Sequence, residues 1–130
     1  MRIMVCYDGS EQSKRATQLA RMHAEAFNGE VFIVTTLEKG KPENQDEIDA
    51  AKKGLEEALA MVASGGINCQ TDLLIHGLDT SDDLVKFAAE KQIDMVVVGI
   101  INKSKVGKLF FGSTAQDLIL NAHCPVLTIK

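Results

Sequence analysis

The run DMVVVG at residues 94–99 is almost wholly apolar, as expected of a strand that is covered on both faces. Such strands belong to parallel sheets, in which a crossover segment connects each strand to the next. Outward from this run, in both directions, strand-like segments alternate with stretches whose apolar residues recur at helical spacing. The alternation predicts an α/β fold, in which a parallel sheet lies between two layers of helices.

The expected elements follow one another regularly along 130 residues. We expect strands at residues 2–7, 30–36, 68–75, 94–99 and 125–130, with a helix in each interval. Helix ends are marked by capping residues: Ser10 opens the first helix, Asn28 with Gly29 ends it, and Asp79 or Thr80 opens the third. The length is typical of one domain, and no linker or internal repeat interrupts it, so we expect a single domain over residues 1–130.

The composition narrows the class of protein. Hydrophobic residues make up 45% of the chain and charged residues 25%, which excludes a disordered chain. Apolar runs of about five residues are too short to span a membrane, and the start of the sequence lacks the apolar core of a signal peptide. The net charge of -4 argues against a nucleic-acid partner. Cys6, Cys69 and Cys124 lie far apart, which indicates reduced thiols and a cytoplasmic protein.

One stretch departs from the overall acidity of the chain. Between Asp94 and Asp117 no acidic residue occurs, whereas Lys103, Lys105 and Lys108 fall there. This local positive charge has two interpretations, an anion-binding loop or a solvated loop that happens to be rich in lysine. In an open parallel sheet, ligands bind at the carboxyl ends of the strands, and this stretch follows such an end.

The residues that flank the lysines favour phosphate among anions. Gly99 ends the apolar strand, and Gly112, Ser113 and Thr114 open the next helix. Gly99 would let a ligand approach the backbone, and the helix start would offer N–H groups and a hydroxyl at the positive end of its dipole. The alternative is that Ser113 or Thr114 only caps the helix and Gly99 only permits a tight turn. Neither a dinucleotide fingerprint nor a P-loop is present.

Catalytic and metal-binding residues are not apparent. His23 falls on the apolar stripe of the first helix, and His76 and His123 are loop residues without carboxylates at metal-ligand spacing. No Ser-His-Asp order and no paired carboxylates in an apolar setting can be recognised. We therefore expect no robust enzyme and no tightly held metal ion.

The segment GIINKSKVGKLFFGST at residues 99–114 resembles the nucleotide-binding segment of the universal stress protein family. The family pattern is Gly, two residues, Gly, nine residues, then Gly with Ser or Thr. Gly99 takes the first place, Asn102 the second, and Gly112 with Ser113 the last two.

The resemblance extends over the whole chain, because YDGS at residues 7–10 looks like the family's first strand end and CPV at residues 124–126 like the start of its last strand. It implies a three-layer, Rossmann-like fold of the adenine nucleotide alpha hydrolase type. The implied sheet has five parallel strands in the order 3-2-1-4-5. The resemblance also implies a homodimer, in which we expect the apolar edge strand at residues 125–130 to meet its twin.

The resemblance assigns the roles of the family's binding residues to the matching positions of this sequence. Considered without the resemblance, Asp8 is a turn residue with no ligand. The resemblance implies that Asp8 forms a hydrogen bond with the ribose of ATP or AMP. Thr36 would border the adenine, and Gly99 would lie against the ribose. Residues 112–114 would hold phosphate through backbone amides and the Ser113 hydroxyl. The resemblance therefore implies a protein of stress response or signalling that binds an adenine nucleotide, with Mg²⁺ as a further ion when the ligand is ATP.

Asn102 is the one departure from the family pattern, which has glycine here in members that bind ATP. Asn tolerates left-handed backbone well, so the loop can keep its path and still cradle phosphate, with Lys103 adding positive charge. Alternatively, the Asn side chain fills the phosphate site, and the protein acts without nucleotide as a dimeric interaction protein. A slow ATPase is the third alternative.

Overall fold

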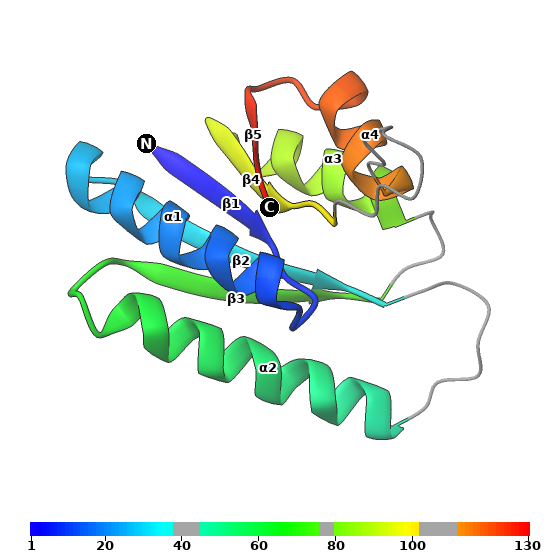
Figure 1. Cartoon of the computed structure of the whole chain (residues 1–130), viewed down its shortest axis with the longest axis horizontal. Coiled ribbons are helices and arrows are strands. Elements are labelled where there is room, and N and C mark those ends of the chain that lie inside the picture. Colours follow the sequence, from blue (N-terminus) through cyan, green and yellow to red (C-terminus); the bar gives the residue numbers. More distant parts are fainter. Residues whose placement is uncertain (38–44, 76–79, 102–111) are drawn as a thin grey trace.

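The computed structural model describes residues 1–37, 45–75, 80–101 and 112–130. Within these ranges, one parallel sheet lies between two pairs of helices (Figure 1). The strands are β1 (Arg2–Cys6), β2 (Glu30–Thr36), β3 (Cys69–Leu74), β4 (Met95–Gly99) and β5 (Val126–Ile129). The helices are α1 (Glu11–Phe27), α2 (Gln45–Ala63), α3 (Thr80–Glu90) and α4 (Ser113–Asn121). The strand order is β3-β2-β1-β4-β5, which confirms the predicted α/β fold and the order implied by the resemblance.

Each face of the sheet packs against its own pair of helices. On one face, Ile3 of β1 packs with Ala16 and Ala20 of α1, whose small side chains let the helix lie close to the strands. On the other face, Met4 of β1 packs with Leu84 of α3. Alternate residues of one strand thus enter opposite cores, which explains why the central strands are apolar throughout.

Helix α1 begins and ends at the residues predicted from the sequence. Ser10 is its N-cap, and the Ser10 hydroxyl oxygen accepts a hydrogen bond of 3.1 Å from the backbone N–H of Ser13. Asn28 is its C-cap in the left-handed conformation, with φ of 52°. In the described ranges, no helix is both long enough and apolar enough to cross a membrane.

The topology leaves room for a ligand at one edge of the sheet. Strand β1 pairs with β2 on one side and with β4 on the other, so the order of strands reverses between β1 and β4. Loops that leave the carboxyl ends of strands at such a point run to opposite sides, and a crevice opens between them. Asp8 follows β1 and Ile100 follows β4, so both come to this crevice.

Candidate functional site

A cavity of about 430 Å³ lies at the carboxyl ends of β1, β2 and β4. Six of the predicted site residues line it: Asp8, Thr36, Gly99, Gly112, Ser113 and Thr114. They come from four different elements or their ends, and the fold brings them together. Asn102 and Lys103, like Lys105 and Lys108, lie outside the described residues. The volume is within the roughly 300–1,000 Å³ that is common for small-molecule sites.

The floor of the cavity is a row of small apolar side chains that sequence reasoning missed. Cys6 of β1 pairs in register with Val34 of β2 and with Val98 of β4, and all three line the cavity. Leu84 of α3 adds an apolar wall. Counting every second residue along the predicted strands would have placed this row on one face of the sheet. A floor of this kind suits a flat, apolar ring.

Cys6 contributes volume rather than reactivity to this floor. Burial, with the nearby negative charge of Asp8, raises the pKa of the Cys6 thiol to about 12. The thiol therefore stays protonated at neutral pH, and it behaves as a small apolar group.

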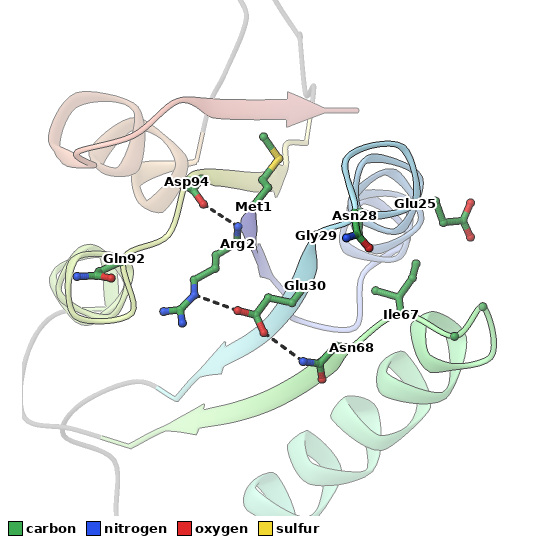
Figure 2. A pocket seen from close by; sticks show the side chains of 13 residues that line it. Met1, Arg2, Glu25, Asn28, Gly29, Glu30, Ile67, Asn68, Gln92 and Asp94 are labelled. Atoms are coloured by element: carbon green, nitrogen blue, oxygen red, sulfur yellow. Dashed lines mark hydrogen bonds and ion pairs between the residues drawn. The ribbon is translucent and has the colours of Figure 1, made fainter.

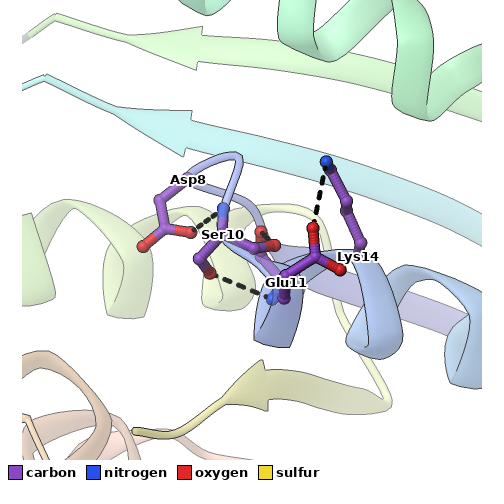
Figure 3. A network of polar contacts seen from close by, with 5 residues as sticks. Asp8, Ser10, Glu11 and Lys14 are labelled. Carbon is purple, nitrogen blue, oxygen red and sulfur yellow. Dashed lines mark hydrogen bonds and ion pairs between the residues drawn. The ribbon is translucent and has the colours of Figure 1, made fainter.

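Asp8 supplies an ionised carboxylate at the start of α1 (Figure 3). Its Oδ1 accepts a hydrogen bond of 2.9 Å from the backbone N–H of Ser10. Partial burial acts to raise the pKa of Asp8, but hydrogen bonds from the hydroxyl and N–H of Ser10 and from Ser13 outweigh it, so the pKa lies below its ordinary value. Asp8 is thus both a turn residue and a cavity residue. As a carboxylate it only accepts hydrogen bonds, which suits the hydroxyl groups of a sugar.

The N-terminus of α4 faces the same cavity without a cap of its own. Gly112 is the N-cap, with no side-chain hydrogen bond, and its carbonyl accepts the N–H of Gln116 at 3.1 Å. The N–H groups of Ser113, Thr114 and Ala115 precede this bond, and such groups point out of the helix end. The interpretation of Ser113 or Thr114 as the helix cap is therefore wrong. With respect to the described residues, this end of α4 is therefore available to an anion.

The structure requires glycine at position 99 but not at position 112. A Cβ at Gly99 would lie 2.6 Å from the backbone carbonyl carbon of Gln12, so the close approach of α1 to β4 requires glycine there. This packing reason is neither the ligand contact nor the tight turn considered from the sequence. A Cβ at Gly112 would meet no described atom within 4 Å. Its φ of -58° does not require glycine either.

A larger cavity, about 870 Å³, lies at the opposite, amino end of the strands. Figure 2 shows Arg2, Glu30 and Asn68 turned toward one another, with Asp94 beside the backbone of Arg2. Arg2 forms an ion pair of 2.9 Å with Glu30, and the backbone N–H of Arg2 donates to Asp94 at 2.7 Å. Asn68 donates to the other oxygen of Glu30 at 3.2 Å. These contacts tie the starts of β1, β2 and β4 together, and we assign this region a structural role.

The histidines have structural partners where they are described. His23 stacks on Phe27, with ring centroids 6.1 Å apart. His123 Nε2 lies 2.9 Å from the carbonyl oxygen of Ile93. His76 lies outside the described residues. In the described part of the chain, no group of three His, Cys, Asp or Glu side chains is arranged to hold a metal ion.

Known proteins match the chain over its full length. The model of the Universal stress protein family matches residues 1–130. A solved universal stress protein from Archaeoglobus fulgidus is 34% identical, covers 100% of this chain and 93% of its own, and has a TM-score of 0.88. A universal stress protein from the same organism, solved in complex with dAMP, is 32% identical, covers 100% of this chain and 98% of its own, and has a TM-score of 0.85. A universal stress protein of Methanocaldococcus jannaschii is 29% identical over 99% of this chain and 81% of its own length.

Proposed function

Since this chain belongs to the universal stress protein family, we propose that it binds an adenine nucleotide, ATP or AMP, at the carboxyl ends of β1, β2 and β4, and acts in stress response or signalling. One observation carries the proposal. The ionised carboxylate of Asp8 and the uncapped N-terminus of α4 line one cavity above an apolar floor. A nucleoside phosphate has the matching parts: hydroxyl groups, an anion and a flat ring.

Each part of the nucleotide has a partner in the cavity. We propose that Asp8 accepts hydrogen bonds from the ribose and that Gly99 lies beside the same sugar. Thr36 borders the adenine above the floor. The amides of Ser113 and Thr114, with the Ser113 hydroxyl, bind phosphate, and the amide of Ala115, which lines the same cavity, joins them. The dAMP complex of the Archaeoglobus fulgidus relative supports this class of ligand.

Two further site residues stay predictions, because they lie outside the described residues. We propose that Asn102 leaves the phosphate site open and that Lys103 adds positive charge to it. For ATP, we propose that Mg²⁺ binds through the phosphate oxygens, since the described side chains offer it no site of three ligands.

Calorimetric titration with AMP, ATP and adenosine tests this function. The variant Asp8→Asn keeps an acceptor for the turn but loses the charge, and we expect AMP to bind at least about tenfold more weakly, the loss of one hydrogen bond to a charged group. Glu11→Gln is the matched control. It also removes one negative charge, from the first turn of α1, but Glu11 does not line the cavity. No AMP or ATP binding by the wild type at millimolar ligand, or equal losses in both variants, would contradict the proposal.

The dependence of binding on pH has a defined sign. Because the folded pKa of Asp8 is depressed below 3.8, the carboxylate and the stability that its hydrogen bonds contribute are fully present above that value. Both are lost as the pH falls through the folded pKa. We therefore expect the effect of Asp8→Asn on AMP affinity to be constant between about pH 5 and pH 8.

We also propose a homodimer through the edge strand at residues 125–130. Val96 N–H donates to the carbonyl of Pro125, and Ile100 N–H donates to the carbonyl of Ile129, so odd-numbered residues of β5 face β4. The backbone groups of Val126 and Thr128 consequently point away from the sheet, where a second copy can pair with them.

Light scattering at tens of micromolar protein tests the dimer. Thr128→Pro removes an outward N–H without touching the ladder to β4, and we expect it to yield monomer. Thr128→Ala, which keeps the N–H, should stay dimeric. A monomeric wild type would overturn the proposal.

We further propose a cytoplasmic location, because all three cysteines are free thiols, as is usual in a reducing compartment.

A further inference from the structure

Helix α4 carries the amides that we assign to the phosphate, and few of its residues are buried against the rest of the protein. It spans nine residues, and its buried residues are Ala115 and Leu118. Both are apolar, and apolar burial is non-directional. A directed contact to a neighbouring element therefore adds to the accuracy with which the N-terminal turn is placed.

A hydrogen bond between α3 and α4 supplies such a contact. The Ser81 hydroxyl donates to the Asp117 carboxylate at 2.9 Å. Ser81 is only 4% exposed and lies in the first turn of α3, and Asp117 is half-buried on α4. The two helices lie side by side on one face of the sheet (Figure 1). A bond to a charged acceptor at a buried donor is directional, and it is costly to break.

Both ends of this bond are one turn from the cavity. Asp117 follows Ser113 by four residues, so its side chain lies beneath the turn that carries the amides of Ser113, Thr114 and Ala115. Ser81 precedes Leu84 by three residues on the same face of α3, and Leu84 lines the cavity. The bond therefore joins the apolar wall of the cavity to its anion-binding end.

We propose that Ser81 and Asp117 are positioning residues for the phosphate of the bound nucleotide. Their hydrogen bond holds α4 against α3, so that the amides of Ser113, Thr114 and Ala115 stay directed at the phosphate. Neither side chain touches the ligand. The inference rests on the proposed nucleotide site, and it concerns only the phosphate half of that site.

The test compares the affinities for AMP and adenosine, because their ratio measures what the phosphate contributes. For Ser81→Ala we expect AMP to bind at least about fivefold more weakly, with adenosine changed less than about twofold. Ser81→Thr keeps the hydroxyl and Asp117→Asn keeps an acceptor oxygen, and both should retain the ratio within about twofold. Asp117→Ala is the second disrupting variant, in case the buried Ser81→Ala does not fold.

Thr17→Val is the control for a general loss of stability. It removes another buried hydroxyl, which donates to the carbonyl of Ser13 at 2.8 Å, and it should leave the ratio unchanged. An unchanged ratio in both disrupting variants overturns the positioning role, and so does an equal loss of AMP and adenosine affinity. In either case AMP binding by the wild type still supports the proposed nucleotide site. If the wild type binds neither AMP nor ATP, the proposed function is wrong and the positioning role with it; if it binds ATP alone, ATP takes the place of AMP in the ratio.

Discussion

Gly112→Ser would give α4 a side-chain cap at its N-cap position, where glycine supplies none. Gly112 has φ of -58° and ψ of 154°, and Ser10, the N-cap of α1, has φ of -69° and ψ of 161°. At Ser10 this backbone lets the hydroxyl oxygen accept the N–H three residues on, at 3.1 Å. The same geometry in Gly112→Ser would direct the new hydroxyl to the N–H of Ala115.

The expected changes have opposite signs for stability and for binding. Replacing glycine by serine at an N-cap stabilises a helix by a few tenths of a kcal/mol. The new cap, however, occupies an amide that we assign to phosphate. A hydrogen bond to a charged group contributes about 1.5–3 kcal/mol, so its loss weakens AMP binding by about tenfold or more. The protein should become slightly more stable and bind AMP less well.

The assay pairs thermal unfolding with calorimetric titration of AMP and adenosine. Gly112→Ala is the matched control, because it adds the same Cβ, for which the described residues leave open space, without the hydroxyl. We expect Gly112→Ser to lose more AMP affinity than Gly112→Ala, with adenosine unaffected in both. Undiminished AMP binding by Gly112→Ser, with the helix stabilised, would refute the assignment of phosphate to these amides.

Three further predictions follow from packing, capping and burial. Gly99→Ala should destabilise the fold by about 1–3 kcal/mol in urea unfolding, because its Cβ meets the backbone of Gln12; unchanged stability would exclude the close approach. Arg21 donates to the carbonyl of Met61 at 2.9 Å near the end of α2, whose last turn has no basic residue. Arg21→Ala should therefore cost about 1–2 kcal/mol by the same measurement, and a loss below a few tenths would argue against this cap. Cys6, whose pKa is raised to about 12 from an ordinary 9.0, should be alkylated by iodoacetamide at pH 8 at least about tenfold more slowly in the folded protein than in the unfolded one, as read by mass spectrometry; equal labelling rates in the two states would contradict the raised pKa.

The local part of the fold could be predicted from the sequence. The apolar run at residues 94–99 became β4, and Ser10 and Asn28 cap α1 as their side chains and backbone preferences require. These features depend on residues within one or two turns of each other. The strand order is different, since periodicity assigns a residue to a face but not a strand to a neighbour. That order came from the family resemblance.

Residues that line the candidate site could be predicted where they belong to a short sequence pattern. Contacts that depend on tertiary packing could not. The glycines and hydroxyls of the family segment belong to one continuous stretch, whereas the contact of Gly99 with Gln12 depends on how closely a helix packs on a strand. The bond from Ser81 to Asp117 likewise joins residues far apart in the chain. Cys6 lies between these cases, because strict alternation places it on the correct face but does not reveal the cavity above it.

The central place of β1 has a consequence for how the chain folds as it is synthesised. Ile3 pairs with Val31 on one side and with Met95 on the other, so one edge of β1 is matched early and the other late. At about 5–20 residues per second, the ribosome produces the second partner roughly 3 to 13 s after the first. During that interval β1 exposes an unpaired apolar edge, which is the kind of surface that chaperones shield and that aggregates recruit. The cavity that we assign to the nucleotide takes its floor from both sides of this edge, so a nucleotide can stabilise the nascent chain through this cavity only after β4 has joined the sheet.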